Sequence, residues 1–295
     1  MKHISFPPVF EFSTHQITLF LSALLFYFLG AGIARYLGVF QKLQDFWYGL
    51  LFITLVSASG FLLQRYFDPG QLKKANQSED GLVMSRQFLL SGLALLMTGS
   101  IIAYLLIFSS RIDIVAIVFL VFTFLIPFLY AIPPIRLAEK GYGDLVLILS
   151  ISIIHPALAF TLQTGTLHSL VLLLSVPLFF FFMAMFISTS LKDYLHAMLS
   201  GDKNLINMLG WKLAMSLHDW FIILGYVLIG VASFQGLPWN FVWPALVPFP
   251  VFIFTMYEIR RIREGARPRW ALLTFSGYAG TGIMLYGLLF MLWFW

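Results

Sequence analysis

The chain contains no cysteine, so disulfide bonds and thiolate metal sites are both excluded. Charged residues are also scarce, at 11% of 295 residues, whereas 60% of the residues are hydrophobic. The segment before the first apolar run has one lysine and no small-residue cleavage pattern, so we expect no removable signal peptide. A soluble domain of this length has nowhere to bury so much apolar surface, and about 20 apolar residues suffice for one bilayer span. The sequence therefore predicts a polytopic membrane protein.

Nine apolar runs can be counted along the chain. They extend over residues 17–34, 47–67, 88–108, 114–130, 145–162, 169–191, 220–234, 244–257 and 271–295. All nine are predicted to be helices, because a helix satisfies its own backbone in lipid and the runs are too long for barrel strands. The eighth run is short and holds Pro244, Pro248 and Pro250, which predicts a kinked or displaced helix. The expected fold class is all-α, with one transmembrane domain over residues 1–295.

Lysine and arginine are unevenly shared between the two sets of loops. With the N-terminus inside, fifteen of the 18 lie in inner segments, and the outer loops hold only Arg35, Lys42 and Arg111. This bias predicts a cytoplasmic N-terminus and an external C-terminus. The net charge of +5 and the basic run 260–269 fit this signal and contact with anionic headgroups, not nucleic-acid binding. The larger polar loops all lie inside, which suits an active site open to the cytoplasm or the lipid.

Two polar clusters follow apolar runs on this inner side. The sequence QRYFD, Gln64 to Asp68, ends the second run, and LKDYLHAMLSGDKNLINMLG, residues 191–210, follows the sixth. Charge at the end of a membrane helix is costly unless it faces a cavity or water, which favours a functional interpretation. Arg65 and Asp68 are three residues apart on one helix face, so a simple helix-end ion pair is the alternative.

The loop after the fourth run reads YAIPPIRLAEKGYGDL, residues 130–145. Its double proline ends the helix and its two glycines permit a tight turn, so a connector is one interpretation. The alternative is that Arg136, Lys140 and Asp144 face a phosphorylated ligand.

The sequence combines nine spans, a YxxPPxRLxxxGxG(E/D)L loop after the fourth span and an aspartate-containing stretch ending in GxxxLxxxLG after the sixth. In this combination it resembles the UbiA superfamily of intramembrane prenyltransferases. The loop positions that match are Tyr130, Pro133, Pro134, Arg136, Leu137, Gly141, Gly143, Asp144 and Leu145. The resemblance covers most of the chain, from about residue 47 to residue 220. Gln163, Thr164 and Gly165 further resemble the branch that prenylates dihydroxynaphthoate for menaquinone.

This resemblance implies a UbiA-like bundle with a central cavity that opens to the cytoplasmic side. It also implies two aspartate-rich motifs whose carboxylates hold Mg²⁺, which binds the diphosphate of a prenyl donor. Mg²⁺ is a hard cation held by a few carboxylates, water and phosphate oxygens. It neutralises the leaving diphosphate while an allylic cation forms and an electron-rich ring attacks it. The implied partners are a prenyl diphosphate, a lipophilic acceptor, membrane lipids and other membrane subunits, with no nucleic acid.

The first motif, NDxxDxxxD in the family, is degraded in this chain. Gln64 stands at the asparagine, Arg65 at the first aspartate, Asp68 at the second and Leu72 at the third. Arg65 is able to meet a diphosphate oxygen directly as a bidentate donor. The alternative is that it pairs with Asp68 in a dead site.

The second motif, DxxxD, is degraded as well. Asp193 matches its first aspartate and Ala197 replaces its second, while Asp202 and Asn204 stand at the lysine and threonine of the GKxTL segment that follows. Two of five expected carboxylates therefore remain. Two are still enough for one Mg²⁺ when water and diphosphate complete the coordination.

The candidate site follows residue by residue from the resemblance. Asp68 and Asp193 are the expected catalytic residues and metal ligands for Mg²⁺. The expected substrate-binding residues are Gln64, Arg65, Tyr130, Arg136, Lys140, Asp144, Lys192 and Lys203. His155, mid-span before Pro156, is interpreted as a helix–helix hydrogen bond, with a proton relay as the alternative.

Two functions fit these observations. The first is a divergent membrane prenyltransferase that transfers a polyprenyl group to an aromatic or lipophilic acceptor, with a role in quinone biosynthesis. The second is a non-catalytic paralogue that binds a quinone or isoprenoid, or serves as a subunit of a membrane complex. The missing carboxylates favour the second function, whereas the retained loop and the two remaining aspartates favour the first.

Overall fold

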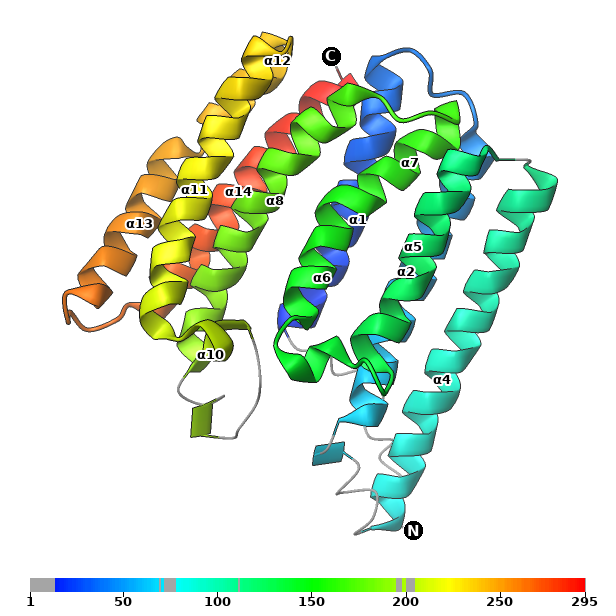
Figure 1. Cartoon of the computed structure of the whole chain (residues 1–295), viewed down its shortest axis with the longest axis horizontal. Coiled ribbons are helices and arrows are strands. Elements are labelled where there is room, and N and C mark those ends of the chain that lie inside the picture. Colours follow the sequence, from blue (N-terminus) through cyan, green and yellow to red (C-terminus); the bar gives the residue numbers. More distant parts are fainter. Residues whose placement is uncertain are drawn as a thin grey trace, which may run out of the picture.

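The structure is a computed structural model that describes residues 14–68, 70–71, 78–110, 112–194, 198–199 and 205–294 (Figure 1). Within these residues every regular element is a helix, and nine helical segments are long and apolar enough to cross a membrane. Each segment corresponds to one predicted apolar run, so the all-α prediction is confirmed. The spans are α1 (Thr14–Tyr36), α2 (Leu43–Phe67), α4 with η1 (Glu79–Tyr104, Leu105–Ser109), α5 (Ile114–Ala131), α6 with η3 and α7 (Gly143–Leu149, Ser150–Ile154, His155–Thr164), α8 with η4 (Ser169–Ser190, Leu191–Asp193), α11 (Trp211–Phe234), α12 with α13 (Trp239–Leu246, Phe249–Arg263) and α14 (Trp270–Phe294).

The spans stand side by side in one bundle, with α4 at one flank and α13 at the other (Figure 1). α1 begins and α14 ends at opposite ends of the bundle, as an odd number of spans requires. We call the lower end in Figure 1, where α2 and α8 finish and α6 begins, the polar end. Two short helices, η2 (Leu137–Lys140) and α10 (Leu205–Leu209), also lie there.

Two glycines bring the inner helices into close contact. A Cβ atom on Gly30 of α1 would lie 2.1 Å from the carbonyl oxygen of Pro156 on α7. A Cβ atom on Gly277 of α14 would lie 2.3 Å from the Oγ of Ser188 on α8. Small residues are the usual means by which helix backbones approach each other in a membrane. These two contacts therefore pair α1 with α7 and α14 with α8.

Two spans are interrupted at prolines. Pro156 has no N–H group and crowds the preceding turn, and the turn before it, η3, is a wider π-helical turn. The eighth span is divided into α12 and α13 just before Pro248, which confirms the kink predicted from its prolines. The interruption at Pro156 matters for the site, because η3 faces the interior cavity described below.

Gln163 fastens the loop between α1 and α2 at the end opposite the polar end. Its Oε1 accepts hydrogen bonds from the N–H groups of Gln41 and Lys42, at 3.2 and 2.9 Å, and its Nε2 donates to the Lys42 carbonyl oxygen at 3.0 Å. This side chain therefore has a structural task. The resemblance of this short segment to the menaquinone branch stays a prediction.

Candidate functional site

A pocket opens at the polar end of the bundle. It encloses about 920 Å³, counted with the space at its open mouth, between α1, α6, the end of α8, α10 and α14. The lining residues are Thr14, His15, Asp144, Phe186, Thr189, Ser190, Lys192, Asp193, Ile206 and Tyr278. Three of the predicted site residues, Asp144, Lys192 and Asp193, therefore share one pocket, although Asp144 belongs to a different span from the other two.

The loop before α6 determines where Asp144 lies. Gly141 adopts φ of 79°, a left-handed conformation that glycine adopts at little cost. A Cβ atom on Gly143 would lie 2.7 Å from the Cα of Ala138 and 2.8 Å from the ring of Tyr130, so only glycine permits this close fold. Asp144 follows at once in the first turn of α6. Its side chain is 17% exposed, and its Oδ1 lies 3.7 Å from the Nε2 of His15 on α1.

Lys192 and Asp193 enter the same pocket from the end of α8. The last turn, η4, is a tighter 3₁₀ turn that begins at the buried Leu191. Lys192 and Asp193 are both exposed, as groups that meet a charged ligand from solution must be. The pocket thus offers two carboxylates and one ammonium group.

Gln64 and Tyr130 lie together next to this pocket. Tyr130 is 5% exposed, and its hydroxyl is within hydrogen-bonding reach of the Gln64 side chain. Gln64 in turn accepts a hydrogen bond of 3.3 Å from Gln16 of α1. Asp144 is close enough to Tyr130 to act on it electrostatically. Three predicted site residues from α2, α5 and α6 are therefore gathered around the first turn of α1.

Asp68 and Arg65 lie at the polar end but are not among the residues that line the pocket. The exposed Asp68 caps the end of α2, and its Oδ1 accepts a hydrogen bond of 2.8 Å from the Gly70 N–H. The Arg65 guanidinium lies 5.7 Å from the ring centre of Phe88 on α4. Their roles as metal ligand and diphosphate donor stay predictions.

Arg136 ties the loop before α6 to the end of α2. Its φ is 40°, its guanidinium donates a hydrogen bond to the Phe67 carbonyl oxygen, and it pairs with Glu139 at 2.7 Å. Lys140 is exposed at the end of η2. Arg136 therefore shapes the cover of the polar end, and direct contact of Arg136 or Lys140 with a ligand stays a prediction.

Several predicted positions lie outside the described residues. They are Lys203 of the site, and Leu72, Ala197, Asp202 and Asn204 of the aspartate motifs. In the part of the chain that the structure describes, no group of three or more His, Asp or Glu side chains is placed to hold a metal. Asp144 and Asp193 supply two carboxylates, and this donor set fits a Mg²⁺ ion that takes its other ligands from water and diphosphate.

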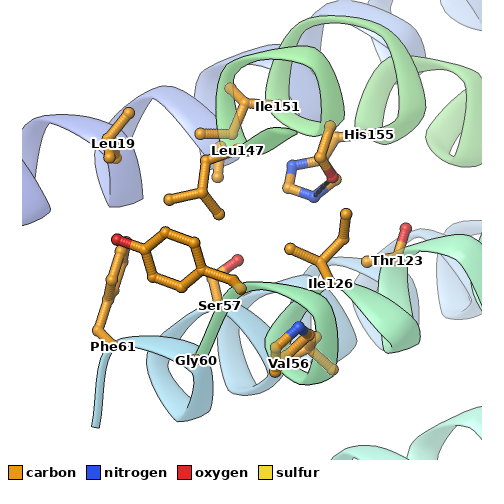
Figure 2. Close-up of a pocket in the computed structure, with 14 residues that line it drawn as sticks. Leu19, Val56, Ser57, Gly60, Phe61, Thr123, Ile126, Leu147, Ile151 and His155 are labelled. Carbon is orange, nitrogen blue, oxygen red and sulfur yellow. Dashed lines mark hydrogen bonds between the residues drawn. The ribbon is translucent and has the colours of Figure 1, made fainter. Parts of the chain in front are cut away.

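An apolar cavity of about 430 Å³, counted with its mouth, lies deeper in the bundle between α1, α2, α5 and the span α6–η3–α7 (Figure 2). Its lining residues are Leu19, Ala23, Val56, Ser57, Gly60, Phe61, Thr123, Ile126, Pro127, Tyr130, Leu147, Ser150, Ile151 and His155. Because Tyr130 lines this cavity and also lies beside Gln64 and Asp144, the cavity runs inward from the polar end.

The basic run 260–269 is largely neutralised by acidic side chains. The ion pairs are Arg261–Glu258, Arg269–Glu258, Arg263–Asp219 and Arg260–Glu264. Glu258 is 1% exposed, and its hydrogen bond raises the pKa of the Arg269 guanidinium further above its ordinary value. The pair between Asp219 and Arg263 was not visible in the sequence, because Asp219 belongs to α11 and Arg263 to α13.

His15, Thr189 and Tyr278 also line the polar pocket and were not predicted. His15 precedes the first apolar run, where a polar residue is unremarkable on its own. Thr189 and Tyr278 lie inside or near apolar runs and resemble packing residues. The feature that distinguishes them is the meeting of α1, α8 and α14, which no local pattern encodes.

Comparison with known proteins gives one family and one fold. A family model described as the UbiA prenyltransferase family matches residues 18–279. The solved structure of a UbiA homologue from Archaeoglobus fulgidus bound to GPP and Mg²⁺ is similar, with a TM-score of 0.61 at 17% identity, over 93% of this chain and 98% of that chain. A homologue structure from the same organism bound to DMAPP and Mg²⁺ gives a TM-score of 0.59 at 18% identity, with the same coverage. No curated protein matches the chain.

Proposed function

Because the chain belongs to the UbiA prenyltransferase family, we propose that it binds a prenyl diphosphate at the polar end and transfers the prenyl group to a lipophilic acceptor. The predicted family is confirmed, and the protein is a multi-pass membrane protein of that family. Quinone biosynthesis as the pathway, and an aromatic ring as the acceptor, are part of the proposal.

One observation carries the proposal. Asp144 and Asp193 come from the fifth and sixth spans, yet they line one pocket together with Lys192. Two carboxylates suit a Mg²⁺–diphosphate group, because Mg²⁺ in phosphate sites takes one or two carboxylates and completes its shell with phosphate and water oxygens. Lys192 supplies a charge-assisted hydrogen bond to the diphosphate. The Archaeoglobus fulgidus homologues bound to GPP or DMAPP together with Mg²⁺ support a prenyl diphosphate as the donor.

The residues of the chain then have separate tasks. Asp193 and Asp144 would hold the Mg²⁺ in this pocket, whereas the metal-ligand role of Asp68, which does not line it, stays a prediction. When bound, the metal supplies the positive charge that stabilises the leaving diphosphate. Arg65 and Lys203 bind diphosphate oxygens, while Gln64 and Tyr130 form the boundary between the polar pocket and the apolar cavity.

A second function is favoured by a different observation. The described residues contain no group of three or more metal-binding side chains, and three of the five carboxylates of the family motifs are replaced in the sequence. A protein with such a site keeps the cavity while losing the chemistry. In that case the protein is a non-catalytic relative that holds a quinone or isoprenoid, or serves as a subunit of a membrane complex.

Binding of a non-hydrolysable donor separates the two functions. Calorimetry with geranyl thiodiphosphate on the purified protein in detergent should show binding that depends on Mg²⁺. Asp193→Asn and Asp144→Asn should each weaken the Mg²⁺-dependent binding by roughly tenfold or more, because each removes a charged ligand of the metal while it keeps the side-chain shape.

Glu264→Gln is the matched control. Glu264 is exposed and pairs with Arg260 at 2.9 Å, away from the pocket, so this change should leave the affinity unaltered. Absence of Mg²⁺-dependent binding to folded wild-type protein would reject the transferase and leave the non-catalytic function.

A further inference from the structure

We propose that the apolar cavity holds the lipophilic acceptor as an elongated ring compound whose inner end carries a hydroxyl or carbonyl oxygen, and that His155 hydrogen-bonds to this oxygen. The description of the ligand as an acceptor rests on the proposed function. The binding site itself rests on the cavity and on the surroundings of His155.

His155 is a buried polar side chain with an unmet hydrogen-bonding atom. It is 4% exposed and lines the cavity. Its Nε2 lies 3.5 Å from the Oγ of Ser150, one turn earlier in the same span. Its Nδ1 is buried and meets no hydrogen-bond partner among the described residues, although the main chain of Ala23 on α1 lies near the imidazole ring.

The other polar groups around the cavity do not share this property. Thr123 donates its hydroxyl to the Phe119 carbonyl oxygen at 2.9 Å, and Tyr130 lies beside Gln64. Among the described residues that line the cavity, the His155 Nδ1 is the one fully buried side-chain polar atom with no partner. A buried polar atom left in this state destabilises the protein, so a ligand oxygen that bonds to it recovers that loss.

The backbone around His155 also differs from a regular helix. His155 directly follows the π-helical turn η3, and Ser150 and Ile151 of that turn line the same cavity. Isolated π-helical turns occur frequently at functional sites. Here the wider turn and the unpaired imidazole nitrogen belong to one cavity wall.

The dimensions of the cavity indicate the shape of the ligand. Figure 2 shows His155 and Thr123 at one end of the cavity and Leu19 and Phe61 at the other. Thr123 and Tyr130 are seven residues apart on α5, which corresponds to about 10 Å. The walls between these ends are almost wholly apolar. An occupant with one polar tip and an apolar body of about this length, roughly two rings, matches the cavity.

The position of His155 favours the acceptor over the prenyl tail as the occupant. A prenyl chain has no oxygen beyond its diphosphate, so it would leave the His155 Nδ1 without a partner. An acceptor anchored at its inner end instead extends toward Tyr130, beside the pocket that holds Asp144. His155 therefore selects acceptors by an oxygen remote from the diphosphate.

Two probes of nearly equal shape test the proposal. 4-Phenylphenol carries a hydroxyl group where 4-methylbiphenyl carries a methyl group. Binding of each to purified protein is measured by equilibrium dialysis at one detergent concentration, without Mg²⁺ or prenyl diphosphate. Wild-type protein should favour 4-phenylphenol by roughly tenfold more than the His155→Leu variant does, since one hydrogen bond to a buried group is worth about that factor. Partition into detergent is the same for both proteins and cancels in this comparison.

Two further variants keep the test informative. Thr123→Val alters the same cavity but removes a hydroxyl that is already bonded to Phe119, so the preference for 4-phenylphenol should persist. Gly60→Leu should weaken the binding of both probes by filling the cavity, while His155 stays in place; a Cβ atom there would lie 3.7 Å from Pro127, an ordinary contact.

The proposal is overturned if His155→Leu keeps the wild-type preference, or if Gly60→Leu binds both probes as wild type does. Neither result depends on the metal or on the donor. A protein that passes this test and fails to bind geranyl thiodiphosphate would retain the ligand site and lose only the transferase function.

Discussion

Arg65 stands where the resemblance to the family predicts a metal-binding aspartate, so relative to that motif it changes the local charge by two units. Its guanidinium lies over the ring of Phe88 on α4. Such a contact stabilises a helix pair by about 0.5–1 kcal/mol at exposed sites. The same guanidinium remains at the polar end, within the segment that resembles the diphosphate motif. Its two tasks, packing and ligand binding, predict different effects of substitution.

Arg65→Ala should weaken Mg²⁺-dependent binding of geranyl thiodiphosphate by about 1.5–3 kcal/mol, because it removes a charged hydrogen-bond donor to the diphosphate. The measurement is calorimetry on protein whose folding has been checked. Arg35→Ala is the control, since Arg35 also lies 5.7 Å from an aromatic ring centre, that of Trp293, but at the opposite end of the bundle.

If Arg65→Ala lowers only the unfolding temperature, the side chain serves the contact with α4 and not the ligand. The double variant Arg65→Asp/Ala197→Asp restores two carboxylates of the family motifs. In an intact but dormant site it should raise the Mg²⁺-dependent affinity above that of wild type.

At the scale of the helices, contact between backbones holds α1 against α7. A Cβ atom on Gly30 would meet the Pro156 carbonyl oxygen at 2.1 Å, and neither atom belongs to a flexible side chain. The helices must therefore separate to admit even one methyl group.

Gly30→Ala should lower the free energy of unfolding by about 1–3 kcal/mol, the usual cost of overpacking. Gly230→Ala is the control, because a Cβ atom there meets nothing within 4 Å. That change should be neutral or stabilising by up to about 1 kcal/mol, since alanine favours a helix over glycine. Thermal unfolding in one detergent measures both variants. Equal effects of the two changes would show that the close contact carries no energy.

The apolar runs predicted the spans well, because lipid forces long apolar segments to become helices. The seventh span was predicted to begin at Trp220, but α11 begins at Trp211. Polar residues in its first turns hid this start, among them Asp219, whose pairing with Arg263 at 2.9 Å depends on the packing of α13. Local composition does not carry such a long-range ion pair.

The sequence predicted which residues belong to the candidate site, but not how they lie relative to one another. Asp144, Lys192 and Asp193 were singled out from two separate motifs, but their common pocket follows from the packing of α6 beside α8. The deeper cavity depends on α1, α2, α5 and α6–α7 at once. His155 was interpreted from its own span alone, so the empty space before it was invisible in the sequence.

For the whole molecule, the charge bias and the nine spans give a topology that fusions test. Reporters placed after Arg86, Lys140, Lys212 and Arg269 should all be found in the cytoplasm, and a reporter after the last span should be found outside. Alkaline phosphatase and green fluorescent protein fusions at each site report the two sides. If a reporter at any one of these four positions were found outside, the count of nine spans would be wrong.

The three hydrogen bonds of Gln163 to the loop between α1 and α2 have a mechanical consequence. They hold α1, α2 and α7 together at the end remote from the polar pocket. Helices that are fastened at one end move apart only by pivoting about it, so their greatest separation occurs at the other end. The polar pocket and the Tyr130 end of the apolar cavity both lie there, so a small tilt of a helix about the fastened end widens the bundle most at the place where the proposed ligands would enter.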